Sequence, residues 1–234
     1  MVAIILGITL LTSCGRPGGT EKSIAQAHMR REVWGGSSSV QVQIRAGGLL
    51  CQTECMFLRP AKPDDAMEVA RVHVRSWQAG YRGLLPDAYL DGLRAEDRAQ
   101  RYRFGSDDVR DPATVVAIDD GKICGFSTTA PARDRDVADD GELSALYVDP
   151  AWWGRGVGAM LIAAARERLV DLGFQSAVLW LLAGNARADR FYRIDGWVPD
   201  GPARTDSVWG VMVDELRYRR ALSYHAQLSR WTNG

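Results

Sequence analysis

Glycines alternate with other residues where an extended segment passes into a helical one. Gly154, Gly156 and Gly158 flank Arg155 and Val157. The first turn of a helix leaves backbone N–H groups without intrahelical acceptors and carries partial positive charge. Glycines there remove the Cβ atoms that would hold an anion away from those amides, and Arg155 adds a full positive charge. The pattern predicts a phosphate-binding loop.

Two common phosphate-binding loops do not fit this spacing. A Walker loop needs Lys-Ser or Lys-Thr at its end, and neither follows Gly158. A dinucleotide-binding fold needs Gly-x-Gly-x-x-Gly, whereas these glycines occupy every second position. The phosphate therefore belongs to a different kind of ligand.

A strand over 142–148 must lead into the loop, and a helix over 159–172 must follow it. Asp149-Pro150 ends the strand, because proline lacks an N–H and restricts the residue before it. The strand has two apolar faces, with Leu143, Ala145 and Tyr147 on one and Leu146 and Val148 on the other. Leucines and alanines repeat at helical spacing after the loop, and Gly173 ends the helix.

A second motif lies downstream, where Asn185 to Trp197 reads Asn-x-x-Ala-x-x-Phe-Tyr-x-x-x-Gly-Trp. This motif and the 153–158 loop, in this order, resemble the two signatures of the GNAT acyltransferases, over roughly 57–220. In that family the loop binds the pyrophosphate of acetyl-CoA. One position departs from the pattern: Trp153 stands where the family usually has Arg or Gln, so that side-chain contact is not carried over.

The resemblance implies a single α/β domain with a mixed, mostly antiparallel sheet of about six or seven strands and helices on both faces. Two parallel central strands, ending at Val148 and Leu182, would be splayed apart. The sequence predicts further strands over 114–118, 123–128, 177–182 and 208–218, with one beginning at 196–198. Turns are expected at 119–121, 201–202 and 205–206, and helices from 63–65 and over 86–93, 95–102 and 186–193.

The resemblance also implies transfer of an acetyl group from acetyl-CoA to a primary amine by direct attack in a ternary complex. The amide of Val148 would polarise the thioester, and Asn185 would both cap its helix and contact the cofactor. The expected cofactor-binding residues are Leu146, Tyr147, Val148, Trp153, Gly154, Arg155, Gly156, Val157, Gly158, Ala159, Asn185 and Tyr192.

The resemblance makes two side chains candidates for proton transfer. Glu142 would accept the proton of the attacking amine, directly or through water, and Tyr192 would protonate the leaving thiolate. Each has a plainer alternative: Glu142 as a surface carboxylate at a strand start, and Tyr192 as a tyrosine packed on the core.

The segment 76–86 resembles that of a GNAT subgroup in which the loop between the first two helices shapes the acceptor pocket, which makes Trp77, Tyr81 and Arg82 candidates for acceptor contact. Core packing is an equal alternative for Trp77 and Tyr81. His73 shares the apolar stripe of the preceding helix and is interpreted as a core histidine. The loop 133–140 is interpreted as a solvated hairpin loop, with closure over an acceptor as the alternative, because it precedes the strand that leads to the site. An aminoglycoside, a polyamine, an amino acid, and a protein N-terminus or lysine all remain open as acceptors.

The composition gives no support for nucleic-acid binding, a metal site or a disulfide framework. The 234 residues carry 29 Lys+Arg and 29 Asp+Glu, so charge gives no argument for nucleic acid. The four cysteines and three histidines have no metal-site spacing, so we expect no metal, no disulfide framework and a reducing, cytoplasmic location. A homodimer is compatible with the family resemblance.

The chain ends are expected to lie outside the domain, which we place at 56–220. Residues 1–55 are interpreted as a disordered leader or upstream extension, with Met56 as the natural start, and 221–234 as a tail. The apolar run 2–11 is too short to span a bilayer, so no stable membrane insertion is expected. Leu11–Cys14 resembles a lipoprotein cleavage box, which leaves anchoring through Cys14 as an alternative. A non-catalytic acyl-CoA-binding or regulatory module is the alternative function.

Overall fold

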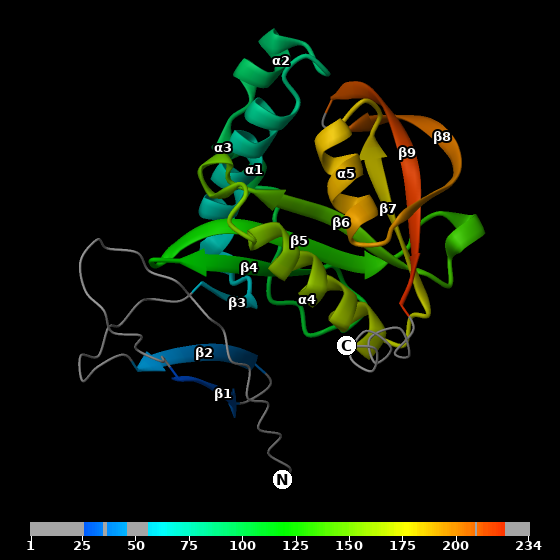
Figure 1. Ribbon diagram of the computed structural model, residues 1–234. Helices are drawn as coiled ribbons and strands as arrows, with labels where there is room; N and C mark the ends of the chain where they lie inside the picture. Colours follow the sequence, from blue (N-terminus) through cyan, green and yellow to red (C-terminus); the bar gives the residue numbers. More distant parts are fainter. Residues whose placement is uncertain (1–25, 35–36, 46–55, 209, 223–234) are drawn as a thin grey trace, which may run out of the picture.

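The computed structural model describes residues 26–34, 37–45, 56–208 and 210–222 (Figure 1). Its main feature is a seven-stranded sheet in the order β3-β4-β5-β6-β7-β9-β8. The strands are β3 (Phe57–Pro60), β4 (Ala113–Asp119), β5 (Lys122–Pro131), β6 (Gly141–Val148), β7 (Ser176–Leu182), β8 (Val198–Val208) and β9 (Val211–Ala221). Neighbours are antiparallel except β6 and β7, which are parallel. The predicted mixed, mostly antiparallel α/β fold is confirmed.

Helices cover both faces of this sheet (Figure 1). They are α1 (Ala66–Gly80), α2 (Asp87–Gly92), α3 (Ala95–Ala99), α4 (Val157–Asp171) and α5 (Ala186–Ile194), with short 3-10 turns at Pro63–Asp65, Arg135–Val137 and Pro150–Trp152. Alternate residues of β4 face opposite ways: Val116 packs with α1, and Ala117 packs with α4. Tyr192 of α5 joins the core cluster on the α4 side.

The parallel strands β6 and β7 separate soon after they begin. They pair only at Gly141 with Ala177 and at Glu142 with Val178. A bulge follows in β6, because Thr129 pairs with Leu143 and Thr128 with Ala145, which leaves Ser144 as the extra residue. A bulge bends its strand and increases its twist, so Ser144 turns β6 away from β7. The predicted splayed pair is confirmed.

The bulge corrects one prediction about β6. Ala145 and Tyr147 pack on the α1 side, as expected, but Leu143 packs in the cluster of Ile162 and Leu169, on the α4 side. The expectation that Leu143 shares a face with Tyr147 is therefore wrong. It assumed strict alternation, and one extra residue reverses the face of everything before it.

The last hairpin also differs from its prediction. Turns were expected at 201–202 and 205–206, but β8 continues through both and pairs with β9 until Val208. The pairing shifts register between Pro199 and Ala203, where Gly201 adopts φ 107°. The residues that were expected to form turns therefore lie within an irregular part of β8. The chain reverses direction only at Gly210.

The expectation of disorder before residue 56 is wrong for two segments. β1 (Gln26–Trp34) and β2 (Ser37–Arg45) form a separate two-stranded antiparallel sheet. The missed signal is alternation, since Val40, Val42 and Ile44 occupy every second position. The rest of 1–55, including Cys14, and residues from 223 onward lie outside the described residues. The boundaries of leader, domain and tail stay a prediction.

Candidate active site

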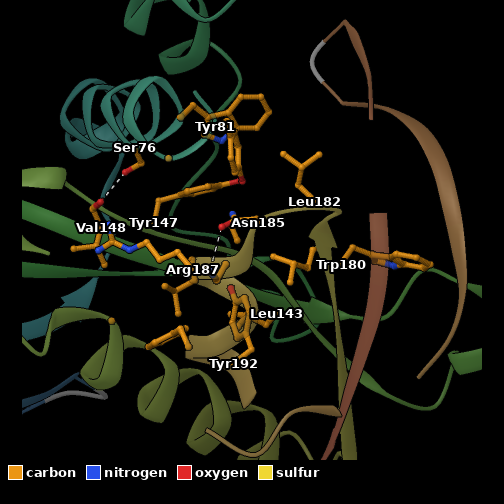
Figure 2. Close-up of a pocket in the computed structure, with 18 of the residues that line it drawn as sticks. Ser76, Tyr81, Leu143, Tyr147, Val148, Trp180, Leu182, Asn185, Arg187 and Tyr192 are labelled. Atoms are coloured by element: carbon orange, nitrogen blue, oxygen red, sulfur yellow. Dashed lines mark hydrogen bonds between the residues drawn. The ribbon is translucent and has the colours of Figure 1, made fainter. Parts of the chain in front are cut away.

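A cavity of about 860 Å³ opens where β6 and β7 diverge. Its walls come from the end of β6, the loop into α4, the first turn of α5, the α1–α2 connection and the β8–β9 hairpin. Figure 2 shows side chains from these elements pointing into the common space. Segments far apart in the sequence thus meet at the end of the splayed pair.

The predicted phosphate loop forms one wall. Gly154 and Gly156 adopt φ 76° and 84°, which favour glycine, and α4 begins directly afterwards. The first N–H bonded within α4 is that of Met160, to Gly156 at 3.1 Å, and no side chain caps the helix. The N–H groups of Val157, Gly158 and Ala159 therefore lack helical acceptors. The cavity is lined by Trp153, Gly154, Gly156, Val157, Gly158 and Ala159. Arg155 is exposed and is not among the lining residues.

A cation missed by sequence reasoning lies over this loop. The guanidinium of Arg187 stacks on the Trp153 ring at 3.5 Å, and the Trp153 indole N–H donates to the Val148 carbonyl at 2.7 Å. Figure 2 shows Arg187 extending from α5 towards Val148. Arg187 lines the cavity and makes no ion pair with any described residue, and burial lowers its pKa. The sequence indicated this cation only indirectly, because Trp153 stands where the loop usually has a cationic or amide side chain.

The edge of β6 presents backbone amides to the gap. Asp149 N–H donates to the Cys124 carbonyl at 2.9 Å, which makes Val148 and Gly125 a non-hydrogen-bonded pair. The N–H groups of Val148 and, two residues earlier, Leu146 therefore point away from β5 and into the gap. The Val148 carbonyl, on the same side, also accepts from Ser76 Oγ at 2.8 Å.

Tyr192 and Asn185 come from α5. The Tyr192 side chain packs edge-on against Phe191 and Trp197, at centroid distances of 5.2 and 6.2 Å. Its hydroxyl has no hydrogen-bond partner among the described residues, and burial raises the pKa of Tyr192 well above its usual value. Tyr192 is therefore a protonated donor at neutral pH. Asn185 caps α5 by accepting from Ala188 N–H at 3.1 Å, as predicted.

Glu142 lies at the closed end of the gap. Its side chain is 6% exposed, and Oε1 lies 3.3 Å from Nη2 of Arg133. It lines the cavity, which favours a functional position over a surface one.

The predicted acceptor residues divide into two groups. Trp77 and Tyr81 line the cavity and also pack with Leu85 and Val213, so core packing and cavity lining coincide. Arg82 forms ion pairs with Asp87 and Asp91 at the surface and is not among the lining residues.

His73 is a core histidine, as predicted. It is 4% exposed, stacks on Tyr147 at 4.5 Å, and places Nδ1 2.6 Å from the Tyr102 hydroxyl. Burial, together with the charge of Arg98, lowers the pKa of His73 to about 3.

Two features are absent from the described residues. Within them, no group of three or more His, Cys, Asp or Glu side chains could hold a metal ion. In the same part of the chain, no helix is long and apolar enough to cross a membrane.

The fold and site define an α/β protein with a phosphate-binding loop beside a splayed parallel pair. The profile of the acetyltransferase (GNAT) family matches residues 75–197, and the chain belongs to this family. The uncharacterised N-acetyltransferase YuaI of Bacillus subtilis is 32% identical over 129 residues, which cover 55% of this chain and 72% of YuaI.

Two solved structures share the fold at low identity. PaiA N-acetyltransferase from Thermoplasma acidophilum, in complex with coenzyme A, is 18% identical with a TM-score of 0.53 over 71% of this chain and 99% of PaiA. YncA from Salmonella typhimurium, a putative acetyltransferase with its cofactor acetyl-CoA, is 18% identical with a TM-score of 0.56 over 73% of this chain and 96% of YncA.

Proposed function

We propose that this protein transfers the acetyl group of acetyl-CoA to a primary amine by direct attack in a ternary complex. The observation that carries the proposal is one cavity lined by both the helix-start amides of Val157–Ala159 and the gap edge of β6. Family membership and neighbours solved with coenzyme A or acetyl-CoA support it.

Two parts of the cofactor, its diphosphate and its pantetheine arm, would be bound by different elements. Its diphosphate would accept hydrogen bonds from the N–H groups of Val157, Gly158 and Ala159, which also form the positive end of the α4 dipole. The pantetheine arm would lie in the gap and pair with the amides of Leu146 and Val148, as an added strand would. Arg187 would supply the side-chain cation that Trp153 cannot, and Asn185 would contact the arm.

The chemistry requires two proton transfers. The amine nitrogen attacks the thioester carbon, the C–N bond forms and the C–S bond breaks. Glu142 lies at the opposite end of β6 from Val148 and would accept the amine proton through a chain of waters, and Tyr192 would donate its proton to the departing sulfur. The predicted Val148 amide would stabilise the oxyanion, and one such donor is worth about 2.7–4 kcal/mol.

Release of free CoA from acetyl-CoA, measured with a thiol reagent while a panel of primary amines is added, tests the proposal. We expect amine-dependent release of one CoA per acetylated amine. Tight coenzyme binding with no release for any amine would favour the non-catalytic acyl-CoA-binding module instead.

A further inference from the structure

The cavity has a second charged end, on the β8–β9 side. Glu215 of β9 lines the cavity and pairs with Leu182, the last residue of β7. Directly paired residues share a face of the sheet, and Leu182 and Val213 pack with Trp77 and Tyr147 on the α1 side. Glu215 therefore lies at the open end of the gap, opposite the aromatic wall from α1 and β6.

One oxygen of Glu215 remains available. Nε and Nη2 of Arg204 both contact Oε2, at 2.9 Å. Oε1 has no hydrogen-bond partner among the described residues, although the side chain is only 13% exposed. Oε1 is accessible from the cavity rather than fully buried, so a cationic donor there would form a favourable charge-assisted hydrogen bond with it.

The surrounding charges favour a cation over an anion. Arg204 is shared by three carboxylates, being 3.3 Å from Asp134, 3.8 Å from Asp206 and 2.9 Å from Glu215, and it stacks on Trp180 at 3.8 Å. This guanidinium is a fixed part of the wall, and two of its three carboxylate partners, Asp206 and Glu215, line the cavity with it. The other lining arginines come from different elements: Arg187 from α5, Arg133 beside Glu142, and Arg101 after α3.

The wall facing Glu215 also suits a cation. The rings of Tyr81 and Tyr147 line the same space, and aromatic faces attract ammonium groups. Burial chiefly, and in smaller part the charge of Glu215, raise the pKa of Tyr81 and Tyr147, so both hydroxyls stay protonated.

Glu215 and the expected thioester lie on different sides of β7. The thioester would lie along the β6 edge of the gap, whereas β7 separates β6 from β9, which carries Glu215. We therefore assign to Glu215 a second group of the acceptor, apart from its nucleophile.

We propose that Glu215 binds a second positive charge of the acceptor, so that the protein acetylates diamines in preference to monoamines and amino acids. The inference rests on the proposed acetyl transfer and adds to it the charge class of the acceptor. It makes Glu215 a positioning residue, separate from the candidate base Glu142.

Three probes of similar length test the proposal: cadaverine, pentylamine and ε-aminocaproate. They carry a second ammonium, no second charge and a carboxylate, respectively. We expect kcat/KM to be highest for cadaverine, by roughly tenfold to a hundredfold over pentylamine, and lowest for ε-aminocaproate. Equal values, or a preference for ε-aminocaproate, would overturn the proposal.

Glu215→Gln keeps the shape and removes the charge. In this variant we expect the KM for cadaverine to rise about tenfold towards that for pentylamine, while kcat and the KM for acetyl-CoA stay unchanged. The control is Asp214→Asn, which removes the neighbouring exposed carboxylate that accepts from Thr205 on the other face of β9. A cadaverine preference that survives Glu215→Gln would refute the role of Glu215.

Calorimetric titration of cadaverine into the protein saturated with CoA makes the same comparison without turnover. Weaker binding to Glu215→Gln than to Asp214→Asn supports the proposal, and equal binding overturns it. This result is independent of CoA release, so failure of acetyl transfer and failure of the acceptor assignment are distinguished.

Discussion

Tyr192 illustrates how the surroundings of a residue can fix its chemistry. Its ring is packed between Phe191 and Trp197, while its hydroxyl has no protein partner among the described residues and opens into the cavity. Burial raises its pKa, so the hydroxyl is protonated at neutral pH and can donate a hydrogen bond to the departing thiolate.

Tyr192→Phe tests this role. The ring packing is kept, so we expect coenzyme affinity to change little while kcat falls at least about tenfold. Steady-state kinetics with calorimetry of CoA binding separate the two effects. Unchanged turnover would remove Tyr192 from the mechanism.

Arg187 offers a second test at the scale of one residue. Removing its charge in Arg187→Ala should weaken CoA binding roughly tenfold, because a charge-assisted contact to phosphate is lost. Pantetheine, which has no phosphate, should bind both proteins equally.

The matched control is Arg190→Ala, which removes an exposed arginine of the same helix that is not among the residues lining the cavity. Calorimetry should show no change for this variant. Equal losses in both variants would point to a general charge effect rather than a contact by Arg187.

At the scale of elements, the loop and α4 act together. Gly154 and Gly156 need positive φ, and Gly158 needs space, because a Cβ there would lie 3.3 Å from Phe191 on α5. The alternating glycines thus combine two backbone turns with close packing of two helices. The same arrangement leaves three N–H groups at the helix start without helical acceptors.

Gly156→Asp should abolish CoA binding, because it places a carboxylate beside the expected phosphate. Gly156→Asn is the control, since asparagine has nearly the same shape and tolerates the φ of 84°. Calorimetry should show a much larger loss for Asp than for Asn. Similar losses would mean that the backbone, and not the charge, explains the effect.

At the scale of the whole molecule, α1 is tied to the sheet by a buried histidine. His73 stacks on Tyr147 of β6, contacts the Tyr102 hydroxyl, and lies near the charge of Arg98. Its pKa of about 3 in the folded protein lies below the ordinary 6.5. The unfolded chain therefore binds a proton in this range that the folded protein does not.

We predict that this difference destabilises the protein as the pH falls from 6.5 towards 3. Each pH unit should cost about 1.4 kcal/mol of unfolding free energy from His73 alone, or about 2 kcal/mol between pH 6.5 and 5. Urea unfolding of His73→Phe, which keeps an aromatic ring, should show a pH slope smaller by that amount. Parallel slopes for both proteins would refute a buried neutral His73.

The sequence alone determined the family, the strand–loop–helix unit and the cap of α5. These features depend on neighbouring residues: glycines at fixed spacing, a proline after a strand, and an asparagine before a helix. The backbone conformation at such positions depends on a few neighbouring residues, so it can be predicted without the rest of the chain.

Only the tertiary structure decided which faces some side chains occupy and which distant residues share the cavity. The bulge at Ser144 moved Leu143 to the other face, and Gly201 bent β8 instead of ending it. Arg187 stacks on Trp153, and Glu215 and Tyr147 line the same cavity, although each pair comes from elements distant in the sequence. Such contacts depend on strand order, register and helix packing, because those global features set which side chains share a cavity.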